Sequence, residues 1–188
     1  MSRLIKSELL KQRTTRTSQL LLLCMTGLIL LVVLLHVLSL STDHISTADG
    51  QLKVVGWGTS IAALFASLLG AMSITAEIRH GTIRPTFLAT PRRMRVIAAK
   101  LTAGALTGVA VGLLAEGLTA AIEAAGLAAR GIHIQLTAAD YTQLLAGGAA
   151  AGALFAALGV GIGAIVRQQV GAVVGLCVWL LLIETTLI

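Results

Sequence analysis

Residues 20–40 read LLLLCMTGLILLVVLLHVLSL, a run without one Asp, Glu, Lys or Arg. A helix needs about 20 predominantly apolar residues to cross the hydrocarbon core of a bilayer. The rest of the chain has the same character, since 56% of its 188 residues are hydrophobic and only 12% are charged. Soluble domains carry about 25% charged residues. The sequence therefore predicts an integral membrane protein.

Four more apolar runs follow the first. Together they predict an all-α fold, a polytopic membrane helix bundle of about five transmembrane helices preceded by an N-terminal interfacial helix. We expect the third helix to continue through an Ala-rich extension to Ala129. The bundle forms one transmembrane domain, residues 20–188, with spans at about 20–40, 54–74, 101–121, 144–166 and 170–188.

The Lys and Arg residues predict the orientation, because they accumulate in cytoplasmic loops. Twelve of the fourteen lie in residues 1–19, in the segment 75–100 or at Arg167, which alternate spans place on one side. Only Lys53 and Arg130 fall on the other side. The N-terminus is therefore expected in the cytoplasm, and the basic residues are expected to contact anionic membrane lipids and not nucleic acid.

Residues 1–19 predict a cytoplasmic or interfacial amphipathic helix. Apolar side chains recur at helical spacing among basic ones: Leu4, Ile5, Leu9 and Leu10 among Lys6, Lys11, Arg13 and Arg16. Glu8 precedes Lys11 by three residues, a spacing at which the two charges stabilise a helix. A solvated basic head before the first span fits the same residues equally well.

The segment 75–100 reads TAEIRHGTIRPTFLATPRRMRVIAAK and predicts helix, break, short helix, break, helix. Glu77 is expected to pair with Arg79 or a later arginine as the second span leaves the membrane. Gly81 is expected to end that helix, because glycine readily adopts positive φ. Thr82 would cap a short helix with an apolar stripe of Ile83, Phe87 and Leu88. Such a stripe on a loop favours docking to a partner or to the lipid surface.

Glycines at four-residue spacing predict close helix packing. They form a double GxxxG in the third span, two pairs in the fourth and one pair in the fifth: Gly104, Gly108 and Gly112; Gly148 and Gly152; Gly159 and Gly163; Gly171 and Gly175. Packing within one bundle is favoured, and contacts in a homodimer or a gate remain the alternative.

Glu116 lies deep inside the third apolar run, where an ionisable side chain usually faces a cavity or a partner. His36 lies at a similar depth in the first span and could pair with it. The two residues are candidates for a polar patch on a translocation path. A protonated Glu116, hydrogen-bonded within the bundle, is the slightly favoured alternative.

Residues Glu77 to Arg93, EIRHGTIRPTFLATPRR, followed by Lys100, resemble the cytoplasmic loop of ABC-2 type transporter permeases. Residues 7–11, SELLK, and 13–16, RTTR, resemble that family's cytoplasmic lead-in, in the right order before the first span. Members of the family have six spans, so the resemblance implies that the last helix is missing from this sequence.

The resemblance implies a permease subunit in the bacterial plasma membrane that forms a homodimer or pairs with a related permease. A separate cytoplasmic ATPase subunit would bind ATP and Mg and drive export. In the family the matched loop contacts this ATPase. That role comes to Glu77, Gly81, Thr82, Pro91 and Arg93 by resemblance, and we add Phe87 and Leu88 from the apolar stripe.

The chain itself contains no catalytic motif. It lacks the GxxxxGK[ST] phosphate loop and the HExxH metal motif, and Cys24 and Cys177 have no neighbours at metal-ligand spacing. We therefore expect no enzyme activity, metal or cofactor on this chain. The alternative function is a small membrane protein that is not a pump, either a pore former or a membrane anchor for a regulatory partner.

Overall fold

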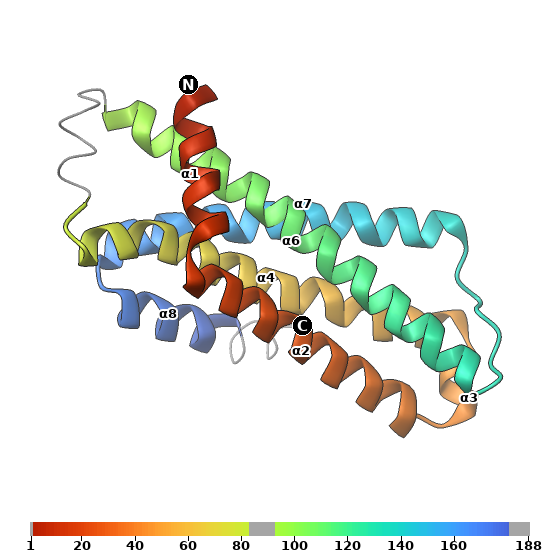
Figure 1. Ribbon diagram of the computed structural model, residues 1–188. Coiled ribbons are helices and arrows are strands. Elements are labelled where there is room, and N and C mark those ends of the chain that lie inside the picture. Colours follow the sequence, from red (N-terminus) through yellow and green to blue (C-terminus); the bar gives the residue numbers. More distant parts are fainter. Residues whose placement is uncertain (1, 83–92, 181–188) are drawn as a thin grey trace.

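The computed structural model describes residues 2–82 and 93–180, and every regular element in these ranges is a helix (Figure 1). Four of the helices are long and apolar enough to cross a membrane, namely α2, α4, α6 and α7. The predicted all-α fold and membrane character are thereby confirmed. In chain order the helices are α1 (Ser2–Thr14), α2 (Arg16–Ser39), α3 (Thr42–Ile45), α4 (Ala48–Arg79), α6 (Arg93–Ala129), α7 (Ala138–Val166) and α8 (Gln169–Val178).

The helices extend beyond the apolar runs from which they were predicted. The segment 75–100, for which the sequence predicts helix, break, short helix, break, helix, is helical at its two ends, because α4 continues to Arg79 and α6 begins at Arg93. A helix satisfies its own backbone hydrogen bonds outside the hydrocarbon core too, so polarity alone does not end it. Of the fifth expected span, 170–188, α8 covers the start, and 181–188 lie outside the described residues.

Glycine ends α4, as the sequence predicts. Gly81 has a φ of +69°, and the N–H of Thr82 donates to the Glu77 carbonyl at 3.0 Å. This bond and that of Gly81 N–H to the Ile78 carbonyl, 3.2 Å, form a Schellman motif. Gly131 has the same φ of +69° directly after α6. These two glycines therefore set where α4 and α6 stop.

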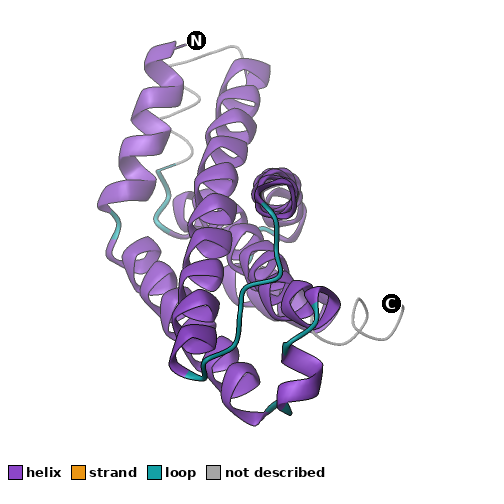
Figure 2. Cartoon of the chain, turned by 90° about the vertical axis from the view of Figure 1, so that its right-hand side faces the viewer, coloured by secondary structure: helices purple, strands orange, loops and turns teal. Residues whose placement is uncertain are grey.

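Helix α4 lies at the centre of the bundle, in contact with α2, α6, α7 and α8 (Figure 1). Of the most apolar 18-residue stretch of α4, 67% is buried, against 22% of the corresponding stretch of α2. We call the end of the bundle where α4 ends and α6 begins the basic end, and the end near α3 the opposite end. Helix α1 stands beside the first half of α6 and crosses the direction of α7 (Figures 1 and 2).

Helix α2 faces the core with one stripe and leaves the rest of its surface uncovered. Its buried residues recur every four positions, Met25, Ile29, Val33 and Val37, each 0% exposed. Leucines cover the other faces and are exposed, which suits contact with lipid chains rather than water: Leu20, Leu23, Leu30, Leu31, Leu34, Leu35 and Leu38.

Helices α6 and α7 approach each other at paired glycines. A Cβ on Gly108 would collide with the carbonyl of Gly152, and one on Gly112 with the carbonyl of Gly148. A Cβ on Gly104 would lie 3.1 Å from Val160. Because backbone atoms cannot move aside as a side chain can, only glycine fits at Gly108 and Gly112.

Helix α7 uses a second glycine pair against α4. A Cβ on Gly159 would collide with the Ser67 carbonyl, and one on Gly163 would lie 2.8 Å from the Ala71 carbonyl. The last expected pair differs, since Gly175 has nothing within 4 Å of its Cβ position and Gly171 meets the Val166 side chain at 3.3 Å. These glycine contacts therefore join α4, α6 and α7, and Gly126 of α6 adds one to α2, where a Cβ would lie 2.6 Å from Val37.

Two polar side chains tie the loops together at the opposite end. Gln51 is 0% exposed, and its amide donates to the carbonyls of Ile45 at 3.2 Å and His133 at 3.1 Å. Arg130 donates to the carbonyls of Val37 and Leu40, the latter at 3.0 Å. The end of α6 thus satisfies orphan carbonyls at the end of α2.

We expect Gly152→Ala to destabilise the bundle, because its Cβ would collide with the Gly108 carbonyl. Overpacking costs about 1–3 kcal/mol or more. Gly161→Ala is the matched control on α7, since its Cβ meets nothing within 4 Å and alanine favours a helix by about 1 kcal/mol. Thermal unfolding in one detergent should give a lower midpoint for Gly152→Ala than for Gly161→Ala. Equal midpoints would contradict the close approach.

Candidate functional site

Four charged residues form a closed ring at the basic end, which we call the charge ring: Glu8, Lys11, Glu77 and Lys100. Lys11 contacts Glu8 at 2.7 Å and Glu77 at 2.9 Å. Lys100 contacts the same two carboxylates, at 2.8 Å and 2.9 Å. Each lysine therefore meets both glutamates, and the four formal charges cancel.

Three helices supply the charge ring. Glu8 and Lys11 come from α1, Glu77 lies near the end of α4, and Lys100 lies in the first turns of α6. A second polar contact between α1 and α6 follows, since the Thr107 hydroxyl donates to the Gln12 side chain. The ring thus attaches α1 to both helices that flank residues 83–92.

The interior of the charge ring is shielded from water. The side chain of Lys100 is 3% exposed and that of Glu8 is 9% exposed, while Lys11 is half-exposed. Burying an unpaired charge is costly, so each of these groups depends on its partners. Both oxygens of Glu8 accept from a lysine, whereas Glu77 uses only Oε1 and its buried Oε2 has no partner among the described residues.

The charge ring shifts the pKa values of Glu8 and Lys11, its two residues on α1. Burial acts to raise the pKa of the Glu8 carboxyl, but the hydrogen bonds and charges of Lys100 and Lys11 outweigh it and hold that pKa below its usual value of 4.5. Burial acts to lower the pKa of Lys11, and its bonds to Glu8 and Glu77 outweigh this and raise that pKa above 10.5. Both groups therefore stay charged across the neutral range.

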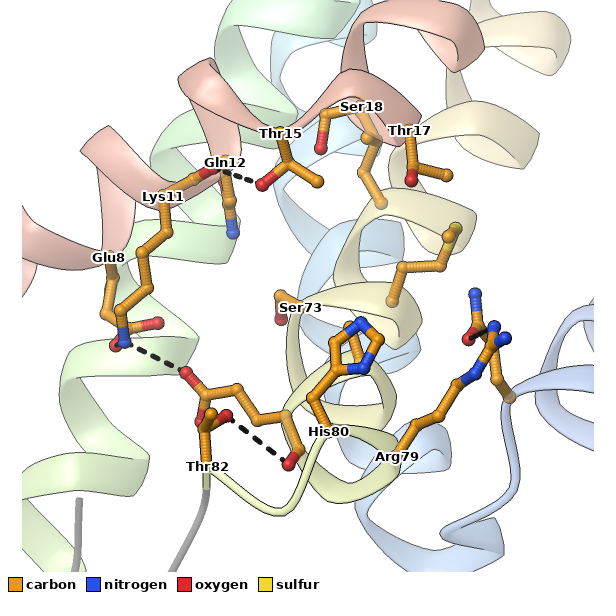
Figure 3. Close-up of a pocket in the computed structure, with 15 residues that line it drawn as sticks. Glu8, Lys11, Gln12, Thr15, Thr17, Ser18, Ser73, Arg79, His80 and Thr82 are labelled. Atoms are coloured by element: carbon orange, nitrogen blue, oxygen red, sulfur yellow. Dashed lines mark hydrogen bonds and ion pairs between the residues drawn. The ribbon is translucent and has the colours of Figure 1, made fainter. Parts of the chain in front are cut away.

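A cavity of about 270 Å³ lies beside the charge ring (Figure 3). Its walls come from α1, the start of α2, the last turns of α4 and the start of α8. Lys11 contacts Glu77 at 2.9 Å, and Figure 3 shows Lys11 on one side with Arg79 and His80 on the other. Arg79 donates to the Gln169 side chain at 3.1 Å. Polar side chains from four helices thus converge at the basic end.

The structure gives Glu77 a different partner from the expected one. The sequence favoured Arg79 or a later arginine, but Glu77 pairs with Lys11 and Lys100. A helix places positions 77 and 79 on different faces, so Arg79 points elsewhere. Gly81 and Thr82 form the turn after α4, and Arg93 begins α6. Ile83, Phe87, Leu88 and Pro91, with the expected short helix, lie outside the described residues.

Glu116 and His36 occupy separate environments. Glu116 is 1% exposed and accepts a hydrogen bond from the Thr59 hydroxyl of α4. The Nδ1 of His36 lies 2.9 Å from the Val32 carbonyl, and its ring centroid lies 5.2 Å from that of Trp57. Among the described residues no hydrogen bond or ion pair joins Glu116 to His36. Glu116 instead fits between Gly58 and Gly148, where a Cβ would touch it.

Sequence reasoning did not single out Glu123, a second buried carboxylate on α6. It is 1% exposed, and its Oε1 has no partner in the described parts of the chain. Glu123 follows Glu116 by seven residues, two helical turns, so both lie on one face of α6. The spacing was visible in the sequence, once the helix was extended to Ala129.

Comparisons with family models, curated proteins and solved structures found no match to this chain. Within residues 2–82 and 93–180, no group of three or more His, Cys, Asp or Glu is arranged to hold a metal ion. The charge ring is internally neutral and is suited to holding helices together rather than to acid–base chemistry.

We expect Lys100→Met to release α1 from the bundle, because it leaves two buried carboxylates sharing one lysine. Removing one partner of a buried ion pair costs about 3–5 kcal/mol. Hydrogen exchange in lipid nanodiscs should become faster along α1 while that of α7 stays unchanged.

Lys53→Met is the matched control, since Lys53 pairs with Asp49 at 3.0 Å but both side chains are 78% exposed. Such a surface pair is worth about 0–1 kcal/mol, so the exchange of α1 should not change. Unaltered exchange of α1 in Lys100→Met would show that the charge ring does not hold this helix.

Acid should also release α1. The lowered pKa of Glu8 means that its stabilising contribution is complete above 4.5 and is lost as the pH falls through the lowered value. The raised pKa of Lys11 gives the opposite sign, with stabilisation complete below 10.5 and lost as the pH rises further. The measurement is the distance between spin labels on cysteines introduced at Leu10 and Leu101, in a variant that lacks the native cysteines. This distance should stay constant between pH 4.5 and pH 10.5 and should increase in acid. A Glu8→Gln variant should lose the acid transition.

Proposed function

We propose that this chain is the transmembrane permease subunit of an ATP-driven exporter of the ABC-2 type. In this proposal the chain lies in the bacterial plasma membrane with its N-terminus in the cytoplasm. Helix α1 lies at the membrane interface, and α8 begins a fifth span. The chain forms a homodimer or pairs with a related permease, and a separate cytoplasmic subunit hydrolyses ATP.

The observation that carries this proposal is the charge ring. Residues 83–92, which hold most of the sequence that resembles the coupling loop, are flanked by Glu77 on α4 and Lys100 on α6. Lys100 contacts Glu8 of α1 at 2.8 Å, and Glu77 contacts Lys11 of α1 at 2.9 Å. A force applied to the loop would therefore reach three helices at once.

The ring supports a mechanical transmission. Closure of the ATPase would displace the ends of α4 and α6, and ion pairs that are partly buried would carry α1 with them. Because α4, α6 and α7 touch at glycines, they would tilt as a packed unit rather than bend separately. The movement would change which side of the membrane the dimer interface faces.

We expect the double variant Phe87→Glu, Leu88→Glu to lose its ATPase partner. Two carboxylates in an apolar contact are costly to bury, so the docking surface would no longer close. The measurement is ATP hydrolysis in the eluate after purification of the tagged chain from its native membrane in mild detergent. Wild type should bring down ATPase activity, and the double variant should bring down little.

Ile134→Glu is the matched control, because it places the same charge on a residue 48% exposed at the opposite end. It should retain the ATPase. An eluate of wild type without ATP hydrolysis would favour the pore former or membrane anchor over the exporter.

A further inference from the structure

A crevice between α4 and α7 lies near the opposite end of the bundle, away from the charge ring. Its volume is about 330 Å³, within the range of about 300–1,000 Å³ typical of small-molecule sites. Two residues of α4 line one wall and four residues of α7 line the other, each set at the spacing of one helix face: Leu52 and Thr59; Asp140, Gln143, Leu144 and Gly147.

The lining has acidic and apolar groups but no Lys, Arg or His among the described residues. Asp140 Oδ2 caps α7 by accepting from the N–H and hydroxyl of Thr137, both within 2.8 Å. Its Oδ1 has no hydrogen-bond partner in the described chain. Leu52 and Leu144 supply hydrocarbon surface. The crevice therefore favours a positively charged group on an apolar body.

A buried carboxylate lies directly behind the crevice wall. Thr59 lines the crevice and donates its hydroxyl hydrogen to Oε1 of Glu116. The other oxygen of Glu116, Oε2, is buried and has no partner among the described residues. Neither a lysine, an arginine nor a histidine of the described ranges pairs with Glu116. A carboxylate buried without a counter-charge is costly, and a cation at Thr59 would supply the missing charge.

We propose that this crevice binds a small organic cation, with its ammonium group at Thr59 and its apolar part against Leu52 and Leu144. Glu116 attracts the cation through Thr59. The assignment of the cation as the exported substrate rests on the proposed exporter function, whereas the binding itself does not. Asp140 adds negative charge farther along the crevice.

Gly147 offers a way to fill the crevice without disturbing the bundle. A Cβ at this position meets nothing within 4 Å, so Gly147→Leu should fold and occupy the space. Gly161→Leu is the matched control, because its Cβ position on the same helix is also open and it lies outside the crevice lining.

The test uses the full chain in lipid nanodiscs and follows binding of para-fluorobenzylamine by fluorine NMR, with empty nanodiscs subtracted. Its neutral counterpart, para-fluorobenzyl alcohol, has the same ring. We expect saturable binding of the amine to wild type and to Gly161→Leu. Binding should be at least about tenfold weaker for the alcohol, for Gly147→Leu and for Glu116→Gln.

Three results would overturn the proposal: no saturable binding of the amine, equal binding of amine and alcohol, or unchanged binding to Gly147→Leu. Gly147→Leu decides the matter if Glu116→Gln does not fold. ATP hydrolysis is measured on wild-type chain purified in the same way. Amine binding without a copurified ATPase would support the binding site and contradict the exporter function. A copurified ATPase without amine binding would support the exporter function and contradict organic cations as its substrate.

Discussion

The contact of α4, α6 and α7 at glycines is the constraint on which the rest of the bundle depends. Lipid chains are as apolar as leucine, so membrane helices associate by close packing rather than by leaving water. Here carbonyl groups occupy the space of the missing side chains at Gly108, Gly112 and Gly159. This contact leaves a slot for Glu116 between Gly58 and Gly148, and it places the α4 and α7 faces that form the crevice.

Apolar packing holds α2 and α8 against this unit, and polar contacts at its two ends add to that packing. The charge ring holds α1 at the basic end, and Arg130 holds the end of α2 at the opposite end. Helix α4 carries both Glu77 of the ring and Thr59 of the crevice. One helix therefore connects the two proposed sites.

Local features were predictable where neighbouring residues are enough to determine them. The Glu8–Lys11 pair follows from their spacing on one helix, and Gly81 ends α4 because glycine tolerates a φ of +69°. The partners of Glu77 were not predictable in this way. Lys11 and Lys100 are distant in sequence, and only the crossing of α1 over α4 and α6 brings them to one point.

The sequence by itself determined an all-helical membrane protein, because long apolar runs have no other stable form in lipid. It also placed Gly81 at the end of α4 and the buried carboxylate of Glu116. Tertiary structure alone decided which glycines face which helix, which lysines neutralise Glu8 and Glu77, and that Thr59 separates Glu116 from a crevice. The physical reason is that helical periodicity defines the face of each residue but not the helix that will cover it.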